Sequence, residues 1–207
     1  MSRFDAAEVE RHEHATWEAS AEIYVDAIGF MTALSGQPEI AIEVGGIDSE
    51  SRVLDVGCGP GLLSSALAKR AGHVDGVDFS EKMIGVARKL YPELAFQVAN
   101  AEELPYTDSS FDAAVCCYTA HHFARPDAVF TEIRRVLRPG GRLVVIHPIQ
   151  SEQASFGSFA EALYESLPPE QVPGGPLLDV SDPKDYELLL QDLSLIHISE
   201  PTRLHCI

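Results

Sequence analysis

The stretch Val53-Leu54-Asp55-Val56-Gly57-Cys58-Gly59-Pro60-Gly61-Leu62-Leu63-Ser64 carries the most information about the fold. It reads as an apolar strand, a turn with three glycines and the start of a helix. Turns of this kind often hold a dinucleotide, because backbone N–H groups and a helix N-terminus bind its pyrophosphate. Three features oppose that role here: Asp55 would repel a phosphate, Pro60 lacks an N–H, and Leu62 replaces the third glycine of G-x-G-x-x-G. The sequence therefore predicts a pocket for a cationic group.

Strands and helices alternate through the central part of the chain. Strands are expected at 52–56, 73–78, 95–99, 112–117 and 142–147, and helices at 62–71, from Ser80 as N-cap, and from Pro126. The last helix is expected to bury Val129, Phe130, Ile133, Val136 and Leu137, before a turn at Arg138-Pro139-Gly140-Gly141. This alternation predicts an α/β fold with a Rossmann-like, doubly wound parallel sheet.

Polar residues stand at the carboxyl ends of these strands, and that edge of an open parallel sheet is the ligand crevice. They are Asp55, Asp78, Asn100, Cys117 and His147. Asp78 lies about 20 residues beyond the first glycine, where the acid of a nucleotide-binding fold contacts ribose hydroxyls. Asn100 and Glu102 are suited to the polar edge of adenine. S-adenosylmethionine (SAM) fits these expectations, since it joins an ammonium, a sulfonium and a nucleoside.

Five motifs together resemble the class I SAM-dependent methyltransferases, in particular the small-molecule group that includes the ubiquinone and menaquinone C-methyltransferases. They are VLDVGCGPG, GVDFS, NAEELPY, the block from Ser110 to Cys117, and RVLRPGG, within about residues 40–150. The resemblance implies SAM as the cofactor. It also implies methyl transfer to an oxygen, nitrogen or carbon atom of a small-molecule acceptor.

The same resemblance assigns residues to each part of SAM. Asp55, Gly57, Cys58, Gly59 and Gly61 would surround the methionine part, with Cys117 and Tyr118 beside it. Asp78 would bind the ribose, and Asn100, Ala101 and Glu102 would meet the adenine, whose ring would pack on Phe79 and Met83.

His121 and His122, just after the fourth strand, are the candidate catalytic residues. Methyl transfer is an in-line displacement in which the protein mainly aligns donor and acceptor. When the acceptor must lose a proton, a base with a pKa near 7 accelerates the reaction. The alternative is a turn that packs against the N-terminal segment. No metal site is predicted, because adjacent histidines without a third ligand at fixed spacing are weak evidence for one.

The flanking segments are expected to have separate roles. Residues 1–45 are predicted to be a helical cover or lid with Trp17 and Tyr24, residues 46–150 the SAM-binding core, and 151–192 a helical segment beside the acceptor. Residues 193–207 resemble a translated sequencing adaptor. They are expected to be a non-native tail that truncates the sheet after its fifth strand.

Charge and composition exclude some functions. The net charge is -17; residues 1–50 carry 11 acidic and 2 basic side chains, residues 151–192 carry 9 and 1, and residues 51–150 carry 11 of each. Nucleic-acid binding needs a basic face, and none is visible. There is no apolar run of about 18 residues and no C-x-x-C pair among the four cysteines. The sequence predicts a cytoplasmic monomer or homodimer without a membrane span.

Two other functions remain open at this point. A nicotinamide-dependent oxidoreductase is disfavoured by Asp55, Pro60 and Leu62, and by the lack of a Tyr-x-x-x-Lys pair. A SAM-binding but inactive fragment is the second alternative. The quinone enzymes usually follow the fifth strand with an acid and a serine, whereas this chain has His147-Pro148, so no quinone is assigned as acceptor.

Overall fold

Five parallel strands form one sheet in the computed structural model. The structure describes residues 5–34 and 36–146, and it describes the side chains of all of these except residues 26–34. The strands are β1 (Arg52–Val56), β2 (His73–Asp78), β3 (Ala95–Val98), β4 (Phe111–Cys117) and β5 (Leu137–Ile146). Their spatial order is β3-β2-β1-β4-β5, so the chain reverses its direction across the sheet between β1 and β4. Ligands of open parallel sheets bind at the carboxyl ends beside this reversal. The predicted doubly wound α/β fold is confirmed.

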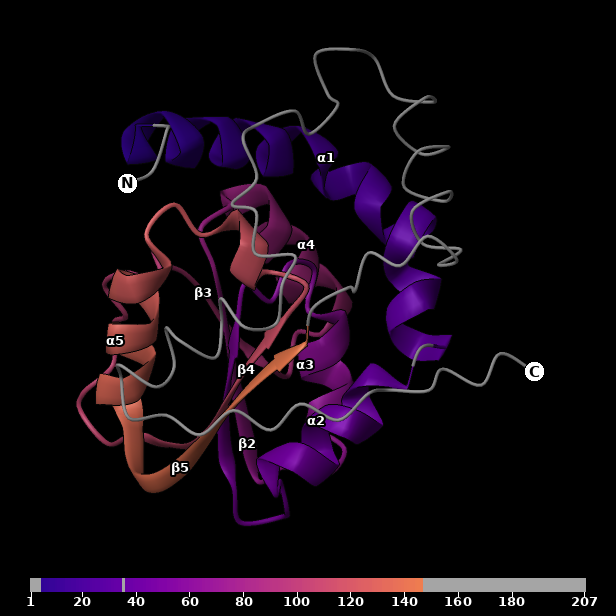
Figure 1. Ribbon diagram of the computed structural model, residues 1–207. Coiled ribbons are helices and arrows are strands. Elements are labelled where there is room, and N and C mark those ends of the chain that lie inside the picture. Colours follow the sequence, from indigo (N-terminus) through magenta and orange to yellow (C-terminus); the bar gives the residue numbers. More distant parts are fainter. Residues whose placement is uncertain (1–4, 35, 147–207) are drawn as a thin grey trace, which may run out of the picture.

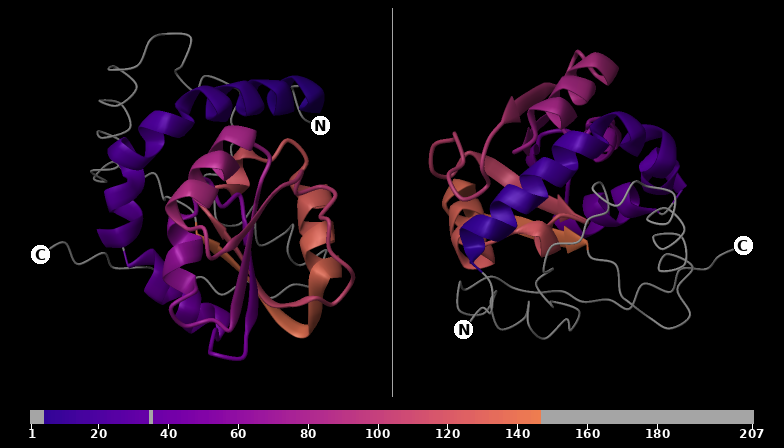
Figure 2. Two further views of the ribbon diagram at one scale, coloured as in Figure 1. Left: turned by 180° about the vertical axis from the view of Figure 1, so that it is seen from behind. Right: turned by 90° about the horizontal axis from the view of Figure 1, so that it is seen from above.

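Helices cover both faces of the sheet and its carboxyl edge (Figures 1 and 2). They are α1 (Ala6–Leu34), α2 (Gln37–Gly45), α3 (Leu62–Leu67), α4 (Glu81–Leu90), the 3-10 turn η1 (Ala120–His122) and α5 (Pro126–Val136). In Figure 1, α5 covers one face, α2 and α3 cover the other, and α1 runs across the top. None of the helices in the described part of the chain has the length and hydropathy to cross a membrane.

The strand β1 is buried on both faces, as expected for a central parallel strand. Its Leu54 and Val56 belong to the cluster that holds Phe130 and Ile133 of α5. Its Val53 belongs to the opposite cluster, with Leu67 of α3. This double burial fixes the end of β1, and with it the position of the glycine turn.

Helix α3 is shorter than the predicted helix at 62–71. It ends at Leu67, and the chain turns so that the N–H groups of Gly72 and His73 both donate to Ser51 O, at 3.0 and 3.1 Å. A Cβ at Gly72 would lie 2.4 Å from Ser49 O. Gly72 is therefore needed for a close backbone approach between the end of this turn and the residues before β1.

The junction of α5 and β5 also differs from the prediction. Leu137 is buried, as expected, but it begins β5 instead of ending the helix. The predicted turn at 138–141 is instead an irregular stretch of β5. Leu137 pairs with Phe111 and Arg142 pairs with Ala113, so five positions of β5 span only two positions of β4. Gly140 takes a φ of 82° within this stretch. The predicted residue His147 and the predicted segments 151–192 and 193–207 lie outside the described residues.

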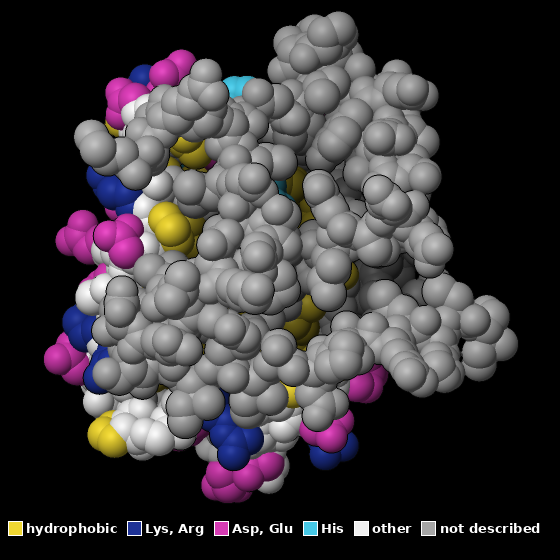
Figure 3. Space-filling view, in the orientation of Figure 1, with side chains coloured by type: hydrophobic (Ala, Val, Ile, Leu, Met, Phe, Trp, Pro, Cys, Tyr) yellow, Lys and Arg dark blue, Asp and Glu magenta, His cyan; other side chains and the backbone are white. Residues whose placement is uncertain are grey.

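Acidic and basic side chains alternate over α5, at the left of Figure 3. Arg135 of α5 pairs with Glu132 at 2.7 Å and with Asp108 at 2.9 Å, and it also donates to Leu104 O and Tyr106 O. This arginine holds the long connection between β3 and β4 against α5. The connection begins with the predicted adenine residues.

Candidate functional site

The glycine turn after β1 uses its own N–H groups inside the protein. Gly57 and Cys58 donate to Val77 O at 2.8 and 3.0 Å, Gly59 donates to Asp78 Oδ2 at 2.9 Å, and Gly61 donates to Cys58 O at 3.0 Å. Pro60 has no N–H to donate. The turn at 57–61 therefore has no free amide for a pyrophosphate.

The three glycines of the turn all have positive φ, which side-chain-bearing residues rarely adopt. A Cβ at Gly57 would lie 2.1 Å from Thr119 Oγ1, and one at Gly61 would lie 2.6 Å from the ring of Phe96. A Cβ at Gly59 would meet nothing within 4 Å. The backbone of Gly59 thus borders open space.

Asp55, at the end of β1, is a buried acid that contacts Ser64 of α3. Its side chain accepts a hydrogen bond from Ser64 Oγ of α3 at 2.6 Å. Burial, with a smaller contribution from the nearby charge of Asp78, raises the pKa of Asp55 to about 7 against the opposing effect of the Ser64 hydrogen bonds. Such an acid would gain a counter-charge from a cationic ligand.

Asp78, at the end of β2, fixes the glycine turn and the start of α4. Its Oδ1 accepts from Ser80 N at 2.9 Å, while its Oδ2 accepts from Gly59 N. Burial raises the pKa of Asp78, and these two amides oppose the rise. Ser80 caps α4 as predicted, because its Oγ accepts from Met83 N at 3.1 Å.

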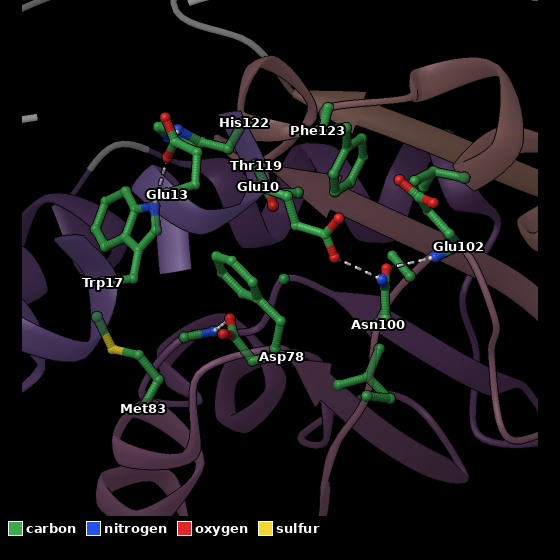
Figure 4. A pocket seen from close by; sticks show the side chains of 18 of the residues that line it. Glu10, Glu13, Trp17, Asp78, Met83, Asn100, Glu102, Thr119, His122 and Phe123 are labelled. Carbon is green, nitrogen blue, oxygen red and sulfur yellow. Dashed lines mark hydrogen bonds and ion pairs between the residues drawn. The ribbon is translucent and has the colours of Figure 1, made fainter. Parts of the chain in front are cut away.

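A pocket opens at the carboxyl edge of the sheet and, with its open mouth, holds about 890 Å³ free of protein atoms (Figure 4). The structure brings most of the predicted site residues to its wall: Gly57, Gly59, Asp78, Phe79, Met83, Asn100, Ala101, Glu102, Cys117, Tyr118 and His122. Asp55 and Cys58 line an adjoining smaller pocket with Gln37. Of the described candidates, Gly61 and His121 line neither pocket.

The predicted adenine residues already contact protein groups. Asn100 Oδ1 accepts from Glu102 N at 2.9 Å, and Asn100 Nδ2 donates to Glu10 Oε1 at 3.0 Å. The carboxylate of Glu102 pairs with Arg125. These contacts hold the loop after β3 in one conformation at the pocket wall.

The loop after β4 contains a residue in a sparsely populated conformation. Tyr118 has a φ of 53°, and its N–H donates to Ile146 O of β5 at 2.8 Å. Burial raises the pKa of both Cys117 and Tyr118. Non-glycine residues with positive φ are frequent at functional sites.

Helix α1 supplies one wall of the pocket through Glu10, Glu13, Trp17 and Tyr24. Sequence reasoning singled out the two aromatic residues but missed the two acids, as well as Thr119 and Phe123. The spacing could have revealed the two acids, because Glu10, Glu13, Trp17 and Tyr24 follow one another at intervals of three, four and seven residues and so share one helix face. The helix is also fastened by Glu18, which accepts from Ser80 Oγ at 2.7 Å and Lys82 N at 3.1 Å.

His122 is held between η1 and α1. Its Nδ1 lies 2.9 Å from Glu13 Oε2, and both side chains are largely buried. Trp17 Nε1 donates to the same carboxylate oxygen at 3.1 Å. His121 lies against His122, with ring centroids 3.9 Å apart.

Known proteins are similar to this region in sequence and in fold. Residues 54–145 match the family model of a methyltransferase domain. The chain is 33% identical over 149 residues to the ubiquinone biosynthesis O-methyltransferase of Aeromonas salmonicida, covering 67% of this chain and 62% of that protein. The crystal structure of YcgJ from Bacillus subtilis is 27% identical in sequence and has a TM-score of 0.58. The match covers 75% of this chain and 66% of that one.

The crystal structure of an S-adenosylmethionine-dependent methyltransferase from Methanococcus maripaludis shares the fold, with a TM-score of 0.65. The two sequences are 20% identical, and the match covers 93% of this chain and 86% of that one. The chain spans about half of the length of the curated relatives it matches, from 42% to 62%. The region 54–145 contains β2 to β4, most of β1 and β5, the glycine turn, Asp55 and Asp78. Residues 54–145 are thus similar in sequence to a methyltransferase domain, and the sheet that they form has the fold of solved methyltransferase structures.

Proposed function

We propose that this protein binds S-adenosylmethionine and transfers its methyl group to a small-molecule acceptor. The observation that carries the proposal is the glycine turn, whose amides are all engaged, between two buried acids with raised pKa values. That arrangement suits a cation, and the turn at 57–61 offers no free amide to a pyrophosphate. SAM presents a sulfonium and an ammonium beside a nucleoside.

The residues present fit the parts of SAM as follows. We assign the ammonium to Asp55, with Gly57, Cys58, Gly59, Cys117 and Tyr118 around the methionine part, the ribose to Asp78, and the adenine to Asn100, Ala101 and Glu102 beside Phe79 and Met83. Gly59 supports this assignment because a ligand can approach its backbone closely. Gly61 acts indirectly, since its missing Cβ leaves room for Phe96.

Bound SAM supplies an electrophilic methyl group on a sulfur that leaves as a neutral thioether. The chain's own task is then to align the acceptor, exclude water and remove a proton. Trp17, Tyr24 and Phe123 give the pocket aromatic walls suited to a flat acceptor. The names of relatives that act in ubiquinone and menaquinone synthesis favour a phenolic acceptor. We place the enzyme in a reducing compartment such as the cytoplasm, supported by the free thiols of Cys58, Cys116 and Cys117.

Thermal melting with three ligands tests the cofactor. SAM and S-adenosylhomocysteine should each stabilise the protein, by about 2.7 kcal/mol at 100 times the dissociation constant. NAD should leave the melting temperature unchanged. A shift with NAD and none with SAM would overturn the proposal in favour of an oxidoreductase.

Turnover tests the reaction itself. The conversion of SAM to S-adenosylhomocysteine is measured with a catechol, a primary amine and an acidic carbon compound as acceptors. Methylation of any of them supports the proposal, and the catechol is expected to be the best. Binding of SAM without turnover across the panel would favour the SAM-binding, inactive alternative.

A further inference from the structure

A buried charged pair joins the helix over the pocket to the loop after β4. Glu13 of α1 and His122 of η1 approach to 2.9 Å, and their side chains are only 4% and 14% exposed. His122, Glu13 and Trp17 all line the pocket, so this pair belongs to the wall of the ligand space (Figure 4).

Neighbouring groups fix both members of this pair. Trp17 Nε1 donates to the Glu13 oxygen that faces His122, and the Trp17 ring meets the imidazole edge-on with centroids 5.0 Å apart. His121 packs on the imidazole from η1 itself. The charged and titratable groups around His122 are thus Glu13, His121 and Asp78. The charge of His122 opposes the rise that burial causes in the pKa of Asp78.

The contact between Glu13 and His122 is an ion-pair distance without hydrogen-bond geometry at Nδ1. Catalytic hydrogen bonds are often poorly aligned in free enzymes and tighten when ligands bind. A carboxylate beside Nδ1 favours the tautomer that carries its proton there, which leaves the lone pair on Nε2.

We propose that Glu13 is a positioning residue that holds the proton of His122 on Nδ1, so that Nε2 serves as the base in methyl transfer. This inference rests on the proposed function. The acceptor gives its proton to Nε2 and keeps the electron pair of the broken bond. That pair forms the new bond to the methyl carbon, and the electrons of the carbon–sulfur bond stay with sulfur, which leaves as a neutral thioether. The resulting imidazolium faces the Glu13 carboxylate. Because Glu13 belongs to α1, the base is complete only when this helix covers the pocket.

The tautomer of His122 is the first readout, and it needs no turnover. Long-range 1H–15N NMR of the 15N-labelled protein reports which ring nitrogen carries the proton, and His122→Asn assigns the signal. Wild type is expected to carry it on Nδ1, and Glu13→Gln is expected to lose that preference. Glu22→Gln is the matched control, because Glu22 is an exposed residue of the same helix.

The rate of catechol methylation is the second readout. Glu13→Gln is expected to lower kcat at least about tenfold, since a wrongly held tautomer disables a histidine base. Its affinity for S-adenosylhomocysteine should be unchanged by calorimetry. Glu22→Gln should behave as wild type in both measurements.

A third variant separates positioning from simple docking of α1. Glu18→Ala loosens the same helix at α4, away from His122. If Glu18→Ala reproduces both the tautomer change and the loss of kcat, Glu13 acts only by docking the helix and the inference is overturned. A wild-type His122 with its proton on Nε2 also overturns it, even when methyl transfer itself is found. Absence of SAM binding would instead refute the proposed function.

Discussion

Asp55 is a buried acid whose ionisation opposes folding of the ligand-free protein. Its pKa is about 7 in the folded state and near 3.9 in an unfolded chain. Between these pH values the unfolded chain has lost the proton that the folded protein keeps, so stability falls as pH rises from about 4 to about 7. Asp55→Asn should therefore raise the free energy of unfolding at pH 8, on the order of 1 to 4 kcal/mol, and leave it unchanged near pH 4.

Thermal and urea denaturation of the ligand-free variant at the two pH values measure this difference. The variant should also bind S-adenosylhomocysteine at least about tenfold more weakly, because a neutral amide cannot pair with an ammonium. Such opposite effects on stability and binding are typical of functional residues. Lower stability of Asp55→Asn at pH 8 would show that the charged Ser64 hydrogen bond outweighs the burial of Asp55.

The glycine turn is the element where two similar substitutions should have different effects. Gly57→Ala brings a Cβ within 2.1 Å of Thr119 Oγ1, whereas Gly59→Ala meets no atom within 4 Å. Both residues have positive φ, which costs about 1 to 2 kcal/mol for alanine. Gly57→Ala should add a steric cost and lower the melting temperature more. Gly59→Ala should mainly weaken SAM binding, since its methyl group enters the open space.

Melting curves and calorimetry on the two variants test this contrast. Thr119→Gly in the Gly57→Ala background is the control, because it removes the colliding side chain and should recover part of the stability. Equal melting temperatures for Gly57→Ala and Gly59→Ala would contradict the predicted collision.

Helix α1 is fastened at the N-terminus of α4 by Glu18. Although burial raises the pKa of Glu18, the hydrogen bonds from Ser80 and Lys82 lower it overall, so the contact is complete at neutral pH and is lost as pH falls through that lowered pKa. Glu18→Ala should cost about 1 kcal/mol at pH 7, which is typical for loss of a helix-capping contact. The difference from wild type should be smaller at about pH 3, because Glu18 takes up a proton as pH falls through its lowered folded-state pKa.

Urea denaturation at the two pH values measures the effect, and Glu22→Ala on the exposed face of α1 is the matched control. A constant difference between wild type and Glu18→Ala at both pH values would mean that the side chain acts through packing instead of charge.

For the whole molecule, the net charge of -17 is the dominant electrostatic feature. Self-repulsion at this charge destabilises the compact state, and salt screens it. Raising NaCl from about 0.01 M to about 0.15 M at pH 7 should therefore raise the melting temperature. Scanning calorimetry with NaCl and KCl in parallel excludes a specific ion effect. A lower melting temperature in salt would show that local pairs such as Arg135 with Glu132 outweigh the net repulsion.

Most strands and helices could be predicted from the sequence, because their signals are local. The strands at 52–56 and 73–78 and the N-cap at Ser80 agree with the structure. The errors occur where a distant backbone decides the conformation. The chain after α3 turns so that Gly72 approaches Ser49, and the register shift in β5 depends on pairing with β4.

The sequence by itself determined the glycine turn, the acids Asp55 and Asp78, and the α/β alternation, since each depends on neighbouring residues and on side-chain chemistry. Only the tertiary structure decided that Glu10 of α1 meets Asn100, that Glu13 meets His122, and that Val77 and Asp78 take up the amides of the turn. These contacts join residues about 20 to 110 positions apart, which no local periodicity encodes. They form because packing of α1 and of the parallel strands brings the carboxyl edge together at one pocket.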